Sequence, residues 1–131
     1  MAIQFDFASS TAAPSTGTAP SVNLQISTTV SNRMVVAYGA SLNGGASAIT
    51  YNGVAMTQAV LEDSTSSTTV NLAGIGVYYI FDASLPTTGG TYAVAATFAA
   101  TDSQAVVGAV ALSGVSQSTG GHVVASTQFT N

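Results

Sequence analysis

His122, the only histidine in the chain, is the first residue to consider for chemistry. A serine or threonine nucleophile would need its imidazole within hydrogen-bonding reach, and a third group would have to orient that imidazole. The chain holds about 35 serine and threonine residues, but none lies in a Gly-x-Ser-x-Gly elbow. His122 follows a Gly-Gly pair at the start of an expected strand. We therefore interpret it as a structural residue and predict that the chain is not an enzyme.

The carboxylates offer two further kinds of chemistry. A glycosidase needs two carboxyl groups that face each other, and a calcium site needs six or more oxygen ligands. The adjacent Glu62 and Asp63 could both reach a cation from a loop, but the chain has no spaced Asp-x-Asp-x-Asp-Gly loop. All the acidic residues are expected at turns or strand ends, where they serve solubility: Asp6, Glu62, Asp63, Asp82 and Asp102. The sequence therefore predicts neither a metal nor a cofactor.

The tyrosines could form a platform for a sugar ring, as aromatic residues do on carbohydrate-binding sandwiches. They are Tyr38, Tyr51, Tyr78, Tyr79 and Tyr92. Four of the five lie within strong strand patterns, so at least half of them are expected in the core. Tyr78 and Tyr79 are adjacent, and side chains alternate between the two faces of a strand. One of these two is therefore expected at the surface or at an interface.

Charge is the scarcest property of this sequence. Charged residues make up 5% of the chain, against roughly a quarter in ordinary soluble domains. Arg33 is the only basic side chain apart from the histidine, so binding to a run of phosphates or to anionic lipid is excluded. No apolar run approaches the length of a transmembrane helix, and we expect no membrane partner. Arg33 has two open roles: an internal salt bridge, or a contact with a carboxylate of a partner.

The apolar residues recur with a period of two along most of the chain, which is typical of β-strands. Asn52-Gly53 between two short apolar runs predicts a tight type I′ hairpin. Gly74 and Gly76 lie within an apolar strand pattern and indicate a bulge or a close backbone contact. Residues 8–20 and 62–67 are expected to be loops. The expected strands are 3–7, 22–26, 33–42, 49–51, 54–61, 68–81, 92–98, 104–115 and 122–129.

These segments predict one all-β domain with eight or nine strands and no convincing helix. Short strands separated by turn signals favour an antiparallel β-sandwich, jelly-roll-like in form. The strand order stays open at this level, so an immunoglobulin-like sandwich is the alternative. Residues 1–20 are expected to form an N-terminal strand and an extended arm, and residues 21–131 the sandwich domain. Apolar residues at 47% are ample for its core.

Four segments in order resemble a β-sandwich domain of tailed-phage virion proteins. They are ITYNGVAMT (49–57), VYY (77–79), LPTTGG (85–90) and VGAVALSGV (107–115). The resemblance covers a little over half of the chain and carries no catalytic residues. For a domain of this size it implies a capsid decoration (cement) protein that binds and stabilises the major capsid protein lattice. It also implies a location on the capsid exterior of the virion, after synthesis in the cytoplasm of the bacterial host.

The scarcity of charge also predicts assembly, because free monomers keep their sheet edges unpaired and remain soluble largely through surface charge. We expect a homo-oligomer, most simply a trimer, in which residues 2–20 or 127–131 reach a neighbouring copy. The candidate interface residues are Ile3, Phe5, Phe7, Arg33 and Phe129. The alternating residues 3–7 are suited to adding a strand to another sheet.

Two other functions remain in play at this level. A carbohydrate- or host-surface-binding module of a tail fibre or adhesin would show an exposed row of aromatic residues beside a polar groove. Buried aromatic residues would instead favour the decoration protein. A small hydrolase would require His122 or two carboxyl groups to converge in a pocket, and no pattern in the sequence indicates that.

Overall fold

Alternating apolar residues form antiparallel strands throughout the part of the chain that the computed structural model describes, namely residues 2–11, 15–17, 19–42, 44–63, 73–98 and 102–118. The strands are β1 (Gln4–Ser10), β2 (Ser15–Gly17), β3 (Ser21–Ile26), β4 (Met34–Ser41), β5 (Ala48–Tyr51), β6 (Val54–Ala55), β7 (Thr57–Asp63), β8 (Gly74–Phe81), β9 (Gly90–Thr97) and β10 (Asp102–Ser113). One 3₁₀ turn, η1 (Asp82–Ser84), follows β8. The described residues hold no helix with the length and apolar character needed to cross a membrane.

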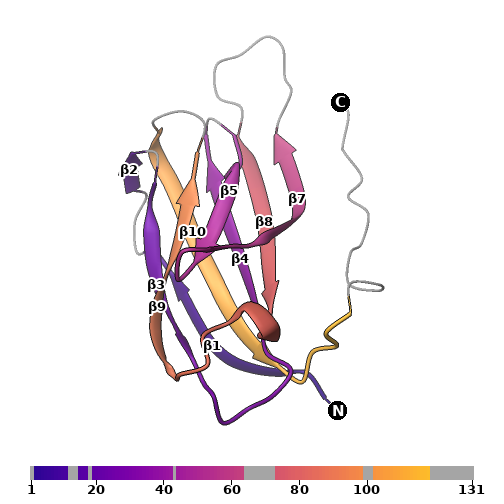
Figure 1. Cartoon of the computed structure of the whole chain (residues 1–131). Coiled ribbons are helices and arrows are strands. Elements are labelled where there is room, and N and C mark those ends of the chain that lie inside the picture. The colour runs from indigo at the N-terminus through magenta and orange to yellow at the C-terminus, as the bar shows by residue number, and fades with distance from the viewer. Residues whose placement is uncertain are drawn as a thin grey trace.

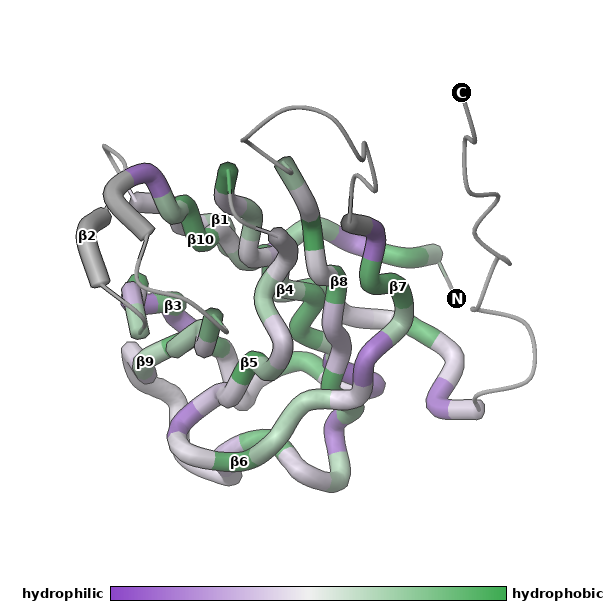
Figure 2. Tube along the Cα trace, turned by 90° about the horizontal axis from the view of Figure 1, so that it is seen from above, coloured by the Kyte–Doolittle hydropathy of each residue, from purple (hydrophilic) through white to green (hydrophobic). Residues whose placement is uncertain are grey.

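The strands form two sheets that pack face to face, as predicted for a β-sandwich (Figure 1). The larger sheet has the order β1-β10-β4-β8-β7, with β2 also paired to β10. The smaller sheet has the order β3-β9-β5-β6. Seen from above, the two sheets are two rows of strands with the core between them (Figure 2).

The strand order is that of a jelly roll. If the short β2 is set aside and β6 and β7 are taken as one bent strand, eight strands remain, and they pair from the outside of the sequence inward. The first pairs with the last, β1 with β10, and then β3 pairs with β9, β4 with β8 and β5 with β6. This nested pairing is a long hairpin rolled into two sheets. It decides between the two sandwich topologies that the sequence left open.

Met56 marks the point where the chain passes from one sheet to the other. β6 before it pairs with β5 in the smaller sheet, and β7 after it pairs with β8 in the larger sheet. The Met56 side chain is buried in the core, and its backbone N–H donates to the Ile49 carbonyl at 3.0 Å. The strand bends inward here, so this side of the sandwich is bridged by a continuous backbone.

The predicted hairpin at Asn52-Gly53 is confirmed. Both residues have positive φ, 51° and 77°, as a type I′ turn requires. Tyr51 pairs with Val54 directly across the turn. Only Gly and a few polar residues adopt this backbone at low cost, which is why the dipeptide identifies the turn so well.

Two predicted loops are partly wrong. Residues 8–10 continue β1, and residues 15–17 form β2, and both strands pair with β10. Residues 4–10 and 15–17 therefore belong to the larger sheet, where a loop or extended arm was expected over 8–20. Glu62 and Asp63 likewise close β7 and are not in a loop. Small polar residues misled the prediction in the first case, because they are common in loops and also tolerated in edge strands. The expected strand at 122–129 lies outside the described residues.

The core between the sheets is built from alternate residues of each strand. The largest side chains with almost no exposure are Tyr51, Leu24, Ile49, Val35, Val94 and Val107. Many of the other inward positions carry alanine or glycine, which allows the chain segment between β4 and β5 to enter one end of the sandwich. Ala46 in this segment is fully buried, and its N–H donates to the Gly39 carbonyl at 3.1 Å.

Gly76 on β8 is required by this close approach. A Cβ at position 76 would collide with the carbonyl oxygen of Ala46, which also accepts a 2.8 Å hydrogen bond from the Tyr78 hydroxyl. The obstacle is backbone that is held from both sides, so it cannot move aside as a flexible side chain would. The close backbone contact predicted for this glycine-containing strand is confirmed at Gly76.

Replacing Gly76 by alanine is expected to lower the free energy of unfolding by about 3 kcal/mol, at the upper end for overpacking of a core. Gly53→Ala is the matched control. No atom lies within 4 Å of a Cβ built at position 53, so Gly53→Ala is expected to lose only about 1 kcal/mol of unfolding free energy, the cost of a left-handed backbone for alanine. Urea denaturation followed by circular dichroism measures both. Equal losses in the two variants would contradict this role of the Ala46 contact.

Candidate functional site

The carboxylates whose side chains the structure describes occupy separate places. Asp6 on β1 accepts a 3.1 Å hydrogen bond from the Ser113 hydroxyl, Glu62 lies on β7, and Asp82 opens η1. Among the described residues, no three His, Asp or Glu side chains come together as metal ligands would. The described part of the chain therefore presents neither the facing carboxyl pair of a glycosidase nor a calcium cluster. His122 lies outside it.

Arg33, immediately before β4, forms an internal ion pair with Asp82. Its Nε donates to Asp82 Oδ1 at 2.7 Å, and its backbone N–H donates to Asp82 Oδ2 at 3.2 Å. Its Nη1 donates to the carbonyl oxygens of Ser27 at 3.1 Å and Pro86 at 3.0 Å. The Arg33 side chain is only 9% exposed. Of the two roles predicted for it, the structure contains the internal one, and this burial leaves little of the side chain for the predicted contact with a partner.

The ion pair also fixes the chain that leaves β10. The Gln117 side-chain oxygen accepts the Asp82 backbone N–H at 3.0 Å, and its amide nitrogen donates to the Arg33 carbonyl at 3.3 Å. We call these three residues, Arg33, Asp82 and Gln117, the polar clasp. It joins the start of β4, the end of β8 and the segment after β10 at one end of the sandwich.

The tyrosines do not form an exposed row. Tyr51 and Tyr78 are buried between the sheets, and Tyr79 points to the outer face but is covered. Tyr92 is half-buried and meets Tyr51 edge-on at 5.9 Å between ring centroids. Burial raises the pKa of Tyr51 to about 12. Tyr38 is the one tyrosine with an exposed ring, and the prediction that at least half of the tyrosines are core residues is confirmed. The predicted exposure of one of the pair Tyr78 and Tyr79 is not observed, because both are under a tenth exposed.

The outer face of the larger sheet is the most unusual surface of the described molecule. Residues paired across neighbouring strands share a face, and Val36 on β4 pairs with Val110 on β10 and with Tyr79 on β8. Tyr38 likewise pairs with Val77. β4 and β8 contain no charged residue. Antiparallel sheets that face water usually alternate apolar and polar residues, whereas these central strands are apolar on both faces.

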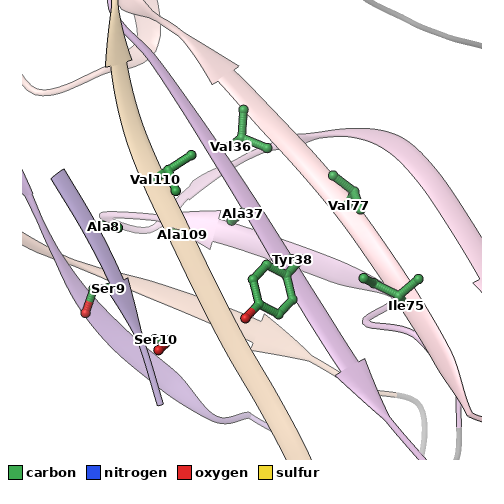
Figure 3. Close-up of a pocket in the computed structure, with 10 residues that line it drawn as sticks. All are labelled: Ala8, Ser9, Ser10, Val36, Ala37, Tyr38, Ile75, Val77, Ala109 and Val110. Atoms are coloured by element: carbon green, nitrogen blue, oxygen red, sulfur yellow. The ribbon is translucent and has the colours of Figure 1, made fainter. Parts of the chain in front are cut away.

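A shallow groove of about 610 Å³ crosses this outer face over β1, β10, β4 and β8 (Figure 3). Val36, Val77, Ile75 and Val110 stand along it. The Tyr38 ring leans from β4 over β10, where a Cβ at Gly108 would lie 2.5 Å from the ring. Glycine at position 108 thus leaves room for the ring to lie flat against the sheet. We call the surface formed by Val36, Tyr38, Ile75, Val77 and Val110 the apolar face.

The predicted interface residues lie mostly at the margin of the larger sheet. Ile3 and Phe5 are exposed, at 62% and 65%, whereas Phe7 is half-buried against the core. They do not share one face, because a register shift between Phe5 and Phe7 in the pairing with β10 breaks the alternation. Phe5 pairs with Leu112. Residues 4–10 pair with the chain's own β10, which counts against donation of this strand to a neighbour. Phe129 lies outside the described residues.

The apolar face was not among the predicted sites, although the sequence carries its signal. The uninterrupted apolar run of residues 34–38 is typical of a strand covered on both faces. Within the described residues, only one of those two faces is covered throughout. The exposed side chains Tyr38 and Ile75, both at 39%, identify the other.

Searches against protein-family models, curated proteins and solved structures found no match to this chain. The resemblance to virion β-sandwich domains therefore rests on the sequence motifs alone.

The polar clasp makes the fold sensitive to acid. Burial by itself would raise the pKa of the Asp82 carboxyl, but the hydrogen bonds from Arg33 and its positive charge outweigh burial and hold that pKa below its usual value. A carboxyl whose pKa is lower in the folded state stabilises the fold fully at pH values above the unfolded pKa, near 3.9. That contribution is lost as the pH falls through the lower, folded-state pKa.

Replacing Asp82 by Asn is expected to lower the free energy of unfolding by about 3 kcal/mol at pH 7, because the buried guanidinium loses its counter-charge. Below about pH 4 the difference from the wild type should narrow, and it should be lost once the pH falls below the lowered pKa of the native carboxyl. Glu62→Gln serves as the control, with an expected change within about 0.5 kcal/mol. Denaturation curves at several pH values test this, and an Asp82→Asn deficit that stays constant down to pH 2 would contradict it.

Proposed function

We propose that this chain is a structural virion protein of a tailed phage, and specifically a head decoration (cement) protein that binds the assembled lattice of the major capsid protein. The observation that carries the proposal is a charge-poor surface that includes a broad apolar face. Such a surface favours lying against other proteins over catalysis in solution. Jelly rolls are used widely in viral capsid domains, and the motif resemblance points the same way.

The disposition of the aromatic residues favours decoration over carbohydrate binding. A sugar platform needs several exposed rings beside polar groups, and among the described tyrosines only Tyr38 is exposed. Seven of the ten side chains along the groove are apolar, and its hydroxyl groups come only from Ser9, Ser10 and Tyr38, whereas the many hydroxyl groups of a sugar require hydrogen-bonding partners. A module of a tail fibre or adhesin is therefore the second candidate.

A decoration protein acts by mass action. A protein that binds the assembled shell and not its free subunits stabilises the shell by about 2.7 kcal/mol per site when it is present at 100 times its dissociation constant. A homo-oligomer, in our proposal a trimer, that bridges several capsid subunits gains further through effective concentration. No nucleic acid or membrane contact is needed for this role.

The test compares phage particles that contain the protein with particles from a deletion strain, before and after the purified protein is added back. We expect the deletion particles to release their DNA at a lower temperature, and we expect added protein to restore the normal temperature. Release is followed with a DNA-binding dye during heating.

Gold-labelled antibodies provide the control for location. Labelling over the head supports decoration. Labelling at the tail, together with an unchanged release temperature and a loss of adsorption to host cells, would support the tail-fibre module instead. Particles that carry no label at either place would contradict both virion roles.

A further inference from the structure

We propose that Asn52 is a site of spontaneous covalent modification, at which the side-chain amide is lost and an aspartate or isoaspartate residue replaces the asparagine. Water is the only co-reactant. The inference goes beyond the proposed function and does not depend on it, because it concerns the hairpin between β5 and β6 in the smaller sheet. It rests on the backbone of this turn, on its exposure and on a comparison with Asn32.

The reaction begins with an intramolecular displacement. A base removes the proton of the Gly53 backbone nitrogen, and this nitrogen attacks Cγ, the side-chain carbonyl carbon of Asn52. The N–Cγ bond forms, the Cγ–Nδ2 bond breaks, and the side-chain amide takes up a proton and leaves as ammonia. Water then opens the resulting five-membered succinimide ring at either of its two carbonyl carbons. Because the reacting groups belong to neighbouring residues, the first step needs only the right geometry.

The turn already has part of that geometry. The ring closes when the Gly53 nitrogen eclipses the Asn52 Cβ, which for an L-residue means ψ near about −120°. A type I′ turn becomes a type II′ turn by a flip of its central peptide, and type II′ combines ψ of about −120° at the first residue with the positive φ that Asn52 already has, 51°. Gly53 follows the flip because glycine adopts either sign of φ. The flipped conformation is strained for asparagine, so the reaction is slow.

No contact in the described structure opposes the flip. Within the described residues, neither the Gly53 N–H nor the Asn52 carbonyl takes part in a hydrogen bond. The hairpin is held by other groups, since the Asn52 N–H donates to the Ala93 carbonyl at 2.9 Å and Tyr51 pairs with Val54. Asn52 and Gly53 are both exposed beside β6, the outermost strand of the smaller sheet (Figure 2). No described atom lies within 4 Å of a Cβ built at position 53, so water and base reach the reacting groups.

Asn32 provides the contrast within the same molecule. It is exposed and has φ 55°, so it shares the left-handed backbone of Asn52. The nitrogen that would attack its side chain belongs to Arg33, and this N–H donates to Asp82 Oδ2 at 3.2 Å. The Asn32 carbonyl accepts the Val115 N–H at 3.0 Å. The peptide between Asn32 and Arg33 is therefore held at both of its polar groups, and a flip would break both hydrogen bonds.

The test incubates the purified protein in mildly alkaline buffer made with water enriched in a heavy oxygen isotope, and then maps peptic peptides by mass spectrometry. Opening of the ring places one heavy oxygen in the product, which separates new conversion from old. We expect Asn52 to be converted at least roughly ten times faster than Asn32, because only the Gly53 nitrogen is unshielded and unengaged. Equal rates at the two sites, or no conversion at Asn52, would overturn the inference.

Asn52→Gly is the matched control variant. Gly-Gly also forms type I′ turns, so the hairpin is kept while the side-chain carbonyl is removed. Each conversion adds one negative charge to a chain whose formal net charge is −4, so ion-exchange chromatography separates the acidic product. We expect an acidic form of the aged wild type to be missing from the aged variant. Identical acidic forms in the two proteins would place the reaction at another residue and contradict the inference.

The two products of ring opening are expected to differ in stability. Opening at Cγ gives an ordinary aspartate, which tolerates positive φ. Opening at the backbone carbonyl gives isoaspartate, whose extra main-chain carbon disturbs the turn that sets buried Tyr51 opposite Val54. We expect the isoaspartate form to melt roughly 5 °C below an Asn52→Asp variant in circular dichroism. Equal melting temperatures would contradict this effect of the modification on the hairpin.

Discussion

The single guanidinium of this chain is enclosed in its own fold, and this placement determines the character of the remaining surface. Arg33 binds Asp82 and two backbone carbonyls, so its charge serves to join segments that are far apart in the sequence. No other described side chain is basic. The surface must therefore interact with its surroundings through hydroxyl groups, a few carboxylates and apolar contacts. The described surface has no free cation with which to attract an acidic partner by charge complementarity.

Small side chains determine how the two sheets meet. Ala46, Gly39 and Gly76 bring backbone to backbone at one end of the sandwich, where larger residues would hold the sheets apart. A core built this way gains less hydrophobic stabilisation per residue than one filled with leucine and phenylalanine. Several of the larger apolar residues of β4 and β8, such as Tyr38 and Ile75, point outward instead. The tight interior and the apolar exterior are thus two consequences of the same distribution of side-chain size along the strands.

Local signals in the sequence predicted the local structure well, but they could not predict contacts between residues far apart in the sequence. The Asn52-Gly53 turn and the inward alternation of β3 and β9 follow from backbone preference and periodicity, which are properties of neighbouring residues. Arg33 and Asp82, which form the ion pair, are 49 positions apart. The sequence alone therefore could not show which of the five acidic residues pairs with Arg33. The pairing of β2 with β10 was missed because its Ser-Thr-Gly sequence is equally typical of a loop. The apolar runs that form the apolar face are visible in the sequence. Which side of these strands is exposed depends on the strand order, and the sequence left that order open.

The segment after β10 covers part of the apolar outer surface of the larger sheet. Val115 packs on Met34 and Tyr79 and leaves each of them under a tenth exposed. Gln117 holds that segment in place through the polar clasp. Further along the same strands, Tyr38 and Ile75 have no such cover within the described residues and remain 39% exposed. The chemistry of the two regions is alike, but among the described residues only the end of the sheet next to Val115 is covered from within the chain.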